Sequence, residues 1–357
     1  MIKNILLFLV LLLGIVIVHE FGHLIAAKIF KVYCSEFSIG MGPLIYRHKG
    51  KETDLTLRLF PIGGFVAIAG DSENELETTV DVQVPFERTM KGIARWKRII
   101  IMLAGVMMNF VLALLIIAGI MLHNGKIYNP PLALVQEILP ATPAEKAALE
   151  TGDLITSVIL PNGQQFAVDD INDLSNSLSL YSGDGAVILQ IERAGEKLEL
   201  SLYPEYLPEE NRYYVGFKTG EYQLVTTNLF NVWGFAASYL WDLACMIGVT
   251  FLGLFRGVGL ENLSGPVGIY QATSEAASAG SVTYLTLLAV ISLNIGIFNL
   301  LPLPIMDGGR VVLLLIESLI GKPLNKKFES LIMNISVILL LMLLLFATSQ
   351  DFLRLFS

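Results

Sequence analysis

The stretch ILLFLVLLLGIVIVHEFGH, residues 5–23, decides the fold, because an uncharged apolar run leads directly into three ionisable side chains. The apolar pattern then resumes through Phe21–Phe30. Crossing a hydrocarbon core of about 30 Å takes about 20 apolar residues in a helix. This segment is therefore predicted to be a membrane span that carries His19, Glu20 and His23.

A secretory signal peptide with a short apolar core is the alternative interpretation of the same segment. Its basic region would hold only Lys3, and no small-residue cleavage site precedes Lys28. Cleavage would also discard or strand the HEFGH sequence. The membrane span is therefore favoured.

The composition of the whole chain extends this prediction. Of its 357 residues 54% are hydrophobic and 16% are charged, whereas a soluble domain carries about 25% charged residues. Three further spans are predicted at Ile99–Leu122, Val282–Met306 and Leu331–Thr348. The net charge of -8 and the lack of a basic patch with interleaved aromatic residues exclude a nucleic-acid partner. The lipid bilayer is the expected environment.

A fifth apolar stretch, Phe230–Phe255, is expected to lie on the outer membrane surface. It contains Trp241 and Asp242 and suits an amphipathic interface element. If it crossed, Asp307 would emerge on the side of the membrane opposite His19. Four transmembrane helices are therefore expected.

An acidic segment separates the second span from this stretch. Lys126–Glu221 holds 15 Asp and Glu residues against 6 Lys and Arg residues. Ala186–Glu192 and Lys197–Tyr203 alternate apolar and polar residues as half-buried strands do, and Asp169–Leu180 has helical spacing. A water-facing α/β domain is predicted here.

The predicted organisation has four parts. Residues 1–125 form a membrane core with a cytoplasmic or re-entrant β region, 126–222 the inserted α/β domain, 223–280 the amphipathic outer segment, and 281–357 a second membrane core. Basic residues gather at the span ends expected to face the cytoplasm: Lys28, Lys31, Lys91, Arg95, Lys97, Arg98, Arg310, Lys322, Lys326 and Lys327. Both termini and the acidic domain are then expected to lie outside the cytoplasm.

The HEFGH sequence matches the H-E-x-x-H motif. Residues four apart lie on one helical face, so His19 and His23 can bind one zinc ion with Glu20 beside the attacking water. An ionisable residue within a span costs about 3 kcal/mol and is by default a functional-site hypothesis. The alternative is a helix end whose polar side chains only meet the lipid headgroups.

A third zinc ligand is expected from another segment, because catalytic zinc has three protein ligands. Asp307 fits best. It ends the third predicted span, about 20 residues from the outer end of that span, and Gly308 and Gly309 would let the backbone bend towards the metal. The alternative role for Asp307 is a helix N-cap.

Four sequence blocks in order carry a family resemblance: HEFGH at 19–23, PIGGF at 61–65, LSGPVG at 263–268 and NIGIFNLLPLPIMDGG at 294–309. With them, nearly the whole chain resembles the site-2 protease family of intramembrane zinc metalloproteases, of the bacterial RseP/RasP type with a single PDZ domain. The second span departs from the family pattern. The family often has Ala-Gly-Pro, then small residues and Asn-Phe, where this chain has AGVMMNF at 104–110.

The resemblance implies roles for individual residues. His19, His23 and Asp307 would bind Zn²⁺, and Glu20 would be the general base. Asn294 and Asn299 would hold the substrate or the geometry of the site. Interhelical hydrogen bonding is the other interpretation of both asparagines.

The resemblance also implies how a helical substrate becomes extended. A sheet built from residues 54–59 and 37–44, with the loop at Gly63 and Gly64, would dip towards the membrane and pair with the substrate. An ordinary cytoplasmic hairpin is the alternative. TPAEKAALETGDLI at 142–155 resembles a PDZ domain, which would bind peptide ends or exclude substrates that still carry a bulky outer domain.

The function implied is hydrolysis of peptide bonds inside transmembrane segments of single-span proteins in a bacterial inner membrane. Anti-sigma factors and signal-peptide remnants are compatible substrates, and a site-1 protease would make the first cut. The active site would lie towards the cytoplasmic side. Two other classes stay open: a metalloprotease with its zinc site in a soluble domain beside anchor helices, and a catalytically silent PDZ-bearing membrane scaffold.

Overall fold

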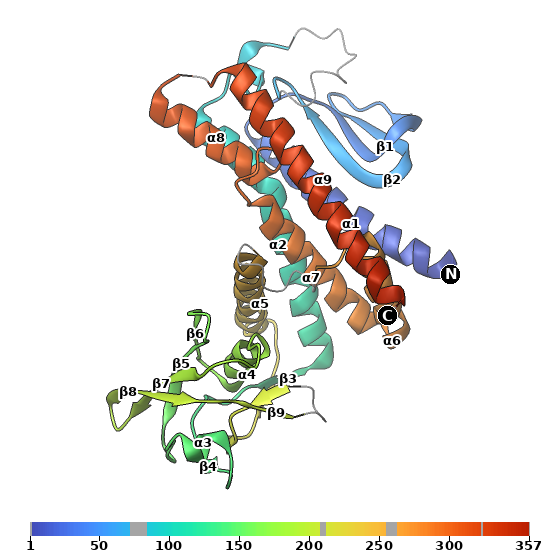
Figure 1. The fold of residues 1–357 in the computed structure, drawn as a ribbon. Helices are drawn as coiled ribbons and strands as arrows, with labels where there is room; N and C mark the ends of the chain where they lie inside the picture. The colour runs from blue at the N-terminus through green and yellow to red at the C-terminus, as the bar shows by residue number, and fades with distance from the viewer. Residues whose placement is uncertain (1, 72–83, 208–211, 255–262, 323, 357) are drawn as a thin grey trace. The chain divides into compact units, whose positions relative to one another are not determined.

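The computed structural model describes residues 2–71, 84–207, 212–254, 263–322 and 324–356. The chain divides into two compact units (Figure 1). One unit combines Met1–Ile120 with Phe230–Ser357, and the other is Met121–Leu229.

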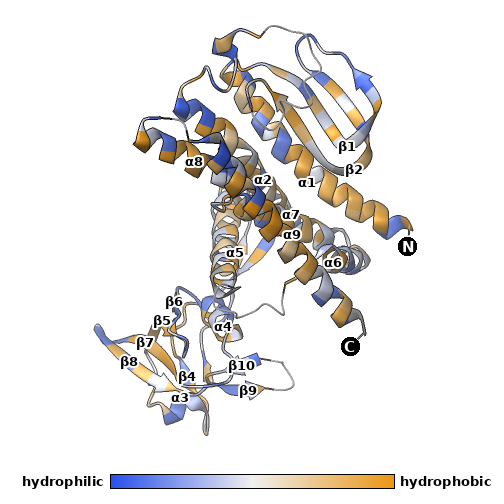
Figure 2. Ribbon diagram, turned by 45° about the horizontal axis from the view of Figure 1, so that its top comes forward, coloured by the Kyte–Doolittle hydropathy of each residue, from blue (hydrophilic) through white to orange (hydrophobic). Residues whose placement is uncertain are grey.

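Long apolar helices dominate the first unit, as the hydropathy colouring shows (Figure 2). Five helices within the described residues are long and apolar enough to cross a membrane. They are α1 (Ile2–Ile29), α2 (Arg95–Asn124), α5 (Val232–Leu254), α7 (Ser281–Asn299) and α9 (Lys326–Phe356).

Helix α5 is the one that the sequence analysis did not count as a span. It is one continuous helix of 23 residues where a surface element was expected over Phe230–Phe255, of which Phe255 lies outside the described residues. By length and composition five described helices could cross a membrane, where four were expected; the surface position of this segment stays a prediction. Phe251 near its end stacks edge-on against Phe298 of α7, with ring centroids 5.6 Å apart.

The third predicted span was too long at its end. Helix α7 ends at Asn299, seven residues before Met306. Pro302 and Pro304 follow within five residues, and proline removes a backbone donor and pushes its preceding residue out of the helical region. A loop therefore follows α7, and a new helix, α8 (Asp307–Ile320), begins at Asp307.

Helices α1 and α2 approach each other unusually closely. A Cβ atom on Gly22 of α1 would collide with the carbonyl oxygen of Ala104 and lie 2.7 Å from Cγ of Met108, both on α2. About two turns earlier on the same side of α1, Leu11 and Ile15 are fully buried in a cluster with Ile291 of α7. Helix α6 (Pro266–Ala279) also packs on α1.

A small sheet of two long strands, β1 (Cys34–His48) and β2 (Asp54–Ile68), lies alongside α1 (Figures 1 and 2). Both predicted strands are confirmed and are longer than expected, and the predicted loop at Gly63 and Gly64 is wrong, because β2 runs through both residues. Residues 34–39 of β1 pair with 64–68 of β2 on one side and with 54–57 on the other. Residues 64–68 thus form an edge of the sheet. Between β2 and α2 lies one short 3-10 helix, η1 (Phe86–Arg88).

The second unit is an α/β domain around a four-stranded antiparallel sheet in the order β6-β5-β7-β8. The predicted strands at 186–192 and 197–203 are confirmed within one residue, and the predicted helix at 169–180 is α4. The elements of this unit are β3 (Lys126–Asn129), β4 (Glu137–Ile138), α3 (Pro143–Lys146), β5 (Leu154–Ile159), β6 (Gln165–Ala167), α4 (Ile171–Ser179), β7 (Val187–Arg193), β8 (Glu196–Leu202), β9 (Glu205–Leu207), β10 (Arg212–Tyr214), β11 (Phe217–Lys218) and β12 (Gln223–Thr226).

This unit has a hydrophobic core of its own, to which Ile155, Val187 and Leu189 contribute fully buried side chains. Strands β3 and β12 at the two ends of the unit pair with each other, Asn129 opposite Gln223. The chain therefore enters and leaves the domain through one two-stranded ribbon.

Candidate metal centre

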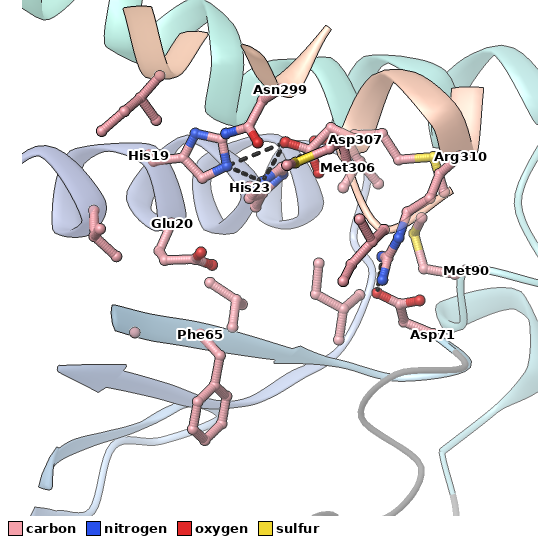
Figure 3. Close-up of a pocket in the computed structure, with 18 of the residues that line it drawn as sticks. His19, Glu20, His23, Phe65, Asp71, Met90, Asn299, Met306, Asp307 and Arg310 are labelled. Atoms are coloured by element: carbon pink, nitrogen blue, oxygen red, sulfur yellow. Dashed lines mark hydrogen bonds and ion pairs between the residues drawn. The ribbon is translucent and has the colours of Figure 1, made fainter. Parts of the chain in front are cut away.

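Two histidines on α1 form the first half of the site. His19 and His23 are one helical turn apart, and their Nε2 atoms are separated by 3.2 Å. The rings meet edge to face with centroids 4.8 Å apart. The i, i+4 spacing predicted from the sequence thus brings both imidazoles to one point (Figure 3).

Asp307 comes to the same point from α8. Its Oδ2 atom lies 3.1 Å from Nε2 of His19 and 3.6 Å from Nε2 of His23. Asp307 is the first residue of α8 and does not cap it, because Met306 holds the N-cap position. Gly308 and Gly309 pack against the backbone of Leu300 and Leu303, which seats the first turn of α8 tightly on the preceding loop.

These three donor atoms fit a zinc ion. A tetrahedral zinc with bonds of about 2.0–2.1 Å holds its ligand atoms about 3.3–3.4 Å apart, close to the three separations seen here. Asp307 Oδ2 is buried and has no hydrogen bond of good geometry among the described residues. A buried carboxylate oxygen without a hydrogen bond is costly, so the site is arranged for a cation. His, His and Asp are also ligands that zinc prefers.

Glu20 lies beside these donors and lines the same cavity of about 570 Å³. The backbone N–H of Val66, in the edge segment of β2, donates a hydrogen bond to its carboxylate. Figure 3 shows this carboxylate between α1 and the sheet. Glu20 is thus held next to the metal donors without being one of them.

The four further residues predicted for the site divide evenly. Asn299 and Gly64 line the cavity with the metal donors, whereas Asn294 and Gly63 are not among its described lining residues. Gly63 has a φ of +85°, and a Cβ there would lie 3.0 Å from the methyl carbon of Met41.

Known proteins are similar to this chain over its whole length. The model of peptidase family M50 matches residues 7–343. The chain belongs to peptidase family M50. The regulator of sigma-W protease RasP of Bacillus subtilis is 28% identical over 428 aligned positions, covering 99% of each chain. The zinc metalloprotease RasP of Shouchella clausii is 29% identical over 436 positions, covering 99% of this chain and 100% of that one.

This M50 peptidase is therefore an integral membrane protein and an intramembrane zinc metalloprotease of the site-2 protease type. Its zinc motif lies in a long apolar helix of the first unit, called the membrane unit from here on, and not in the separate α/β domain. That excludes the alternative of a metalloprotease whose zinc site sits in a soluble domain.

The sequence analysis of this peptidase missed two residues of α2, Gly105 and Asn109. A Cβ on Gly105 would collide with Nε2 of His23 and lie 2.8 Å from Nε2 of His19. Asn109 is fully buried, with Nδ2 3.4 Å from Nδ1 of His19. A polar residue in an otherwise apolar span was the available signal, but the AGVMMNF sequence was considered only for its helix geometry.

An ion pair in the cavity wall was also missed. Nη1 of Arg310, on the first turn of α8, lies 3.3 Å from Oδ2 of Asp71, three residues after β2 (Figure 3). The pair ties the helix that carries Asp307 to the sheet. No spacing rule links positions 239 residues apart, so the sequence alone held no signal for it.

Proposed function

We propose that His19, His23 and Asp307 hold the zinc ion of this M50 peptidase and that Glu20 is its general base. The observation that supports this most is the convergence of both Nε2 atoms on Asp307 Oδ2, a buried oxygen to which no described residue donates a hydrogen bond. The donor set arises from two helices 284 residues apart in sequence, which makes an accidental meeting of three metal-binding groups a poor explanation.

The chemistry follows from the positions of the chain's own groups. A bound zinc supplies Lewis acidity, which polarises the scissile carbonyl and makes water reactive at neutral pH. Glu20 accepts the proton of the attacking water and passes it to the leaving amine. The Val66 N–H orients the carboxylate for this task. The cavity of about 570 Å³ leaves room for water and an extended peptide segment.

The edge of β2 is the proposed site of substrate pairing. A helical substrate hides its peptide bonds in hydrogen bonds, so it must be extended before hydrolysis. Residues 64–68 pair with β1 on one side, and Gly64, Phe65, Val66 and Ile68 line the cavity on the other. An extended substrate would add as a further strand there. This arrangement favours pairing over the ordinary-hairpin interpretation.

The proposed substrates are single-span membrane proteins of a bacterial plasma membrane. The name of the Bacillus subtilis relative ties that protein to sigma-W regulation, so an anti-sigma factor already cut by a first protease is a fitting substrate class. Signal-peptide remnants fit as well. By the distribution of basic residues, the site faces the cytoplasmic half, and both termini and the α/β domain lie outside.

The α/β domain is proposed to be a PDZ-like filter rather than a catalytic part. Its sheet, two short helices and TPAEKAALETGDLI turn are compatible with that fold. A folded domain of this kind on the outer side of the membrane would exclude substrates whose outer part is still bulky.

Zinc content together with cleavage tests the residue roles. Glu20→Gln should keep zinc and lower cleavage of a single-span reporter by about 10²–10⁴-fold, because it removes the base and no ligand. His19→Ala should lose both. Equal cleavage by wild type and Glu20→Gln would overturn the general-base role. Zinc without cleavage in the wild type would favour the silent scaffold.

The filter role needs a deletion that leaves the membrane unit intact. Asn129 and Gln223 are opposite each other in the β3–β12 ribbon, so residues 130–222 can be replaced by an Asn-Gly turn. The expected result is unchanged cleavage of a truncated reporter and new cleavage of one that keeps a folded outer domain. Rejection of that second reporter by the deletion variant, with the truncated one still cleaved, would overturn the filter role.

A further inference from the structure

One face of α2 lies directly against both zinc-motif imidazoles. Ile101, Gly105 and Asn109 follow one another at intervals of four residues, and all three are buried. The lack of a side chain at Gly105 allows this approach, since a Cβ there would run into both rings. The two outer residues of the three each face the Nδ1 atom of one histidine.

The contact to His23 fixes how that ring is protonated. Its Nδ1 lies 2.8 Å from the backbone oxygen of Ile101. A carbonyl oxygen only accepts hydrogen bonds, so Nδ1 carries a proton and donates it. The lone pair of a neutral His23 is then on Nε2, the atom that faces Asp307. A hydrogen bond from the second ring nitrogen to an oxygen is the usual support of a metal-binding histidine.

His19 is contacted at the same ring atom, Nδ1, but by the amide nitrogen of Asn109 and not by an oxygen. Nδ2 of Asn109 lies 3.4 Å from Nδ1 of His19, while Oδ1 of Asn109 is buried without any hydrogen bond among the described residues. An Nδ2 donor would require an unprotonated Nδ1, which puts the proton of a neutral ring on Nε2. That tautomer cannot bind a metal through Nε2.

Turning the amide by 180° resolves both difficulties. The oxygen and nitrogen of an asparagine amide have nearly the same shape, so their assignment is decided by the hydrogen-bond network. With Oδ1 facing His19, the buried oxygen gains a donor, and the imidazole carries its proton on Nδ1. The hydroxyl of Ser292 on α7 donates to the backbone oxygen of Asn109 at 2.9 Å, a hydrogen bond that does not involve the amide.

We propose that Asn109 is a positioning residue for the zinc site: its Oδ1 accepts the Nδ1 proton of His19 and so keeps Nε2 free for the metal. Ile101 does the same for His23 through its backbone. The inference rests on the proposed ligand roles of His19, His23 and Asp307. It gives α2, which holds no ligand, the task of fixing the tautomer and orientation of two ligands.

Substitutions at Asn109 test whether its side chain accepts a hydrogen bond from His19 or donates one to it. The measurement is zinc affinity of the purified full-length protein, by competition with a chelator of known affinity. Asn109→Leu keeps the size and removes the acceptor, so affinity should fall by about 10–100-fold. Asn109→Asp only accepts and should bind at least as tightly as wild type. Asn109→Met, a weak acceptor that cannot donate, should fall between them.

Controls keep the outcomes distinct. Ser292→Ala removes a hydrogen bond to the same residue without touching the amide and should leave zinc affinity unchanged, and thermal unfolding of each metal-free variant shows that it folds. Equal weakening by Asp, Met and Leu, or wild-type affinity in Asn109→Leu, would overturn the inference. Wild-type zinc affinity in Asp307→Ala would instead overturn the proposed ligand set.

Discussion

Asp153 in the α/β domain and Asp307 in the membrane unit are aspartates in opposite surroundings. Asp153 of the α/β domain is fully buried and receives 2.7 Å hydrogen bonds from Nε and Nη2 of Arg193. The backbone N–H of Glu150 adds a third at 2.9 Å. Oδ2 of Asp307 in the membrane unit is buried, faces two imidazole nitrogens, and has no hydrogen bond within the described ranges of the chain.

The difference distinguishes a carboxylate that stabilises the fold from one that is proposed to bind the metal. Burial opposes ionisation of Asp153, but the hydrogen bonds and charge of Arg193 and the Glu150 N–H outweigh it and lower the pKa of this carboxyl. Its charge is compensated inside the protein, so it needs no ligand. Asp307 Oδ2 has no such hydrogen bonds in the part of the chain that the structure describes, which fits the proposal that its partner is a zinc ion.

The largest effect is expected when the carboxylate of Asp307, in the membrane unit, is removed. Asp307→Ala removes one of three proposed zinc ligands, so zinc content after dialysis should fall to near zero and cleavage of a reporter by more than about 10³-fold. The fold should persist, since Oδ2 accepts no hydrogen bond from the residues that the structure describes. Zinc content is measured by mass spectrometry of the metal, and folding by thermal unfolding. Full zinc occupancy would show that the third ligand lies elsewhere.

The matched substitution in the α/β domain should lower the stability of that domain and leave zinc binding unchanged. Asp153→Ala leaves Arg193 without its partner and should destabilise the α/β domain by about 3 kcal/mol, the lower end for breaking a buried pair, because Arg193 keeps some exposure. Zinc content should stay at the wild-type level. Hydrogen exchange of β5 and β7 amides in the full-length protein measures the first effect. Loss of zinc without faster exchange would contradict the distinction drawn between the two aspartates.

Lowering the pH should remove the stability that the ionised carboxylate of Asp153 contributes to the α/β domain. Because its folded pKa lies below the ordinary value of 3.8 for an aspartate, its ionised form contributes stability above that pH, and this contribution is lost as the pH falls through the lowered folded pKa. The difference in hydrogen-exchange protection between wild type and Asp153→Asn should therefore be largest near pH 7 and shrink below about pH 4. A constant difference across this range would show that Asp153 acts by packing alone.

The sequence predicted more of the proposed zinc ligands than of their surroundings. The HEFGH spacing and the polar end of an apolar span pointed to His19, His23 and Asp307, whose donor atoms the structure brings together, because local periodicity and span length decide which residues can reach one depth. Asn109 was missed because its role depends on where α2 packs, and the Asp71–Arg310 pair because it joins segments with no periodic relation. The end of α7 was predicted too late although Pro302 and Pro304 gave a local signal.

The smallest effect concerns a third aspartate, Asp170, which is only partly buried. Its carboxylate accepts hydrogen bonds from the backbone N–H groups of Asn172 and Asp173 at 2.7 and 3.1 Å, and the Asp173 carboxylate accepts from the N–H of Asp170 at 3.2 Å. This capping box holds the start of α4. Asp170→Ala should cost about 1 kcal/mol, and Asp170→Asn much less, because asparagine keeps the accepting oxygen.

Hydrogen exchange of the first turn of α4 measures this cost, with β7 amides as the internal reference. Equal protection in wild type and Asp170→Ala would mean that packing of Leu174 and Leu178 alone holds the helix. The loss of stability on substitution is expected to be larger at Asp153 than at Asp170, because Asp153 has a charged partner and is more deeply buried. Asp307 falls outside this order, because its removal should cost zinc and activity rather than fold.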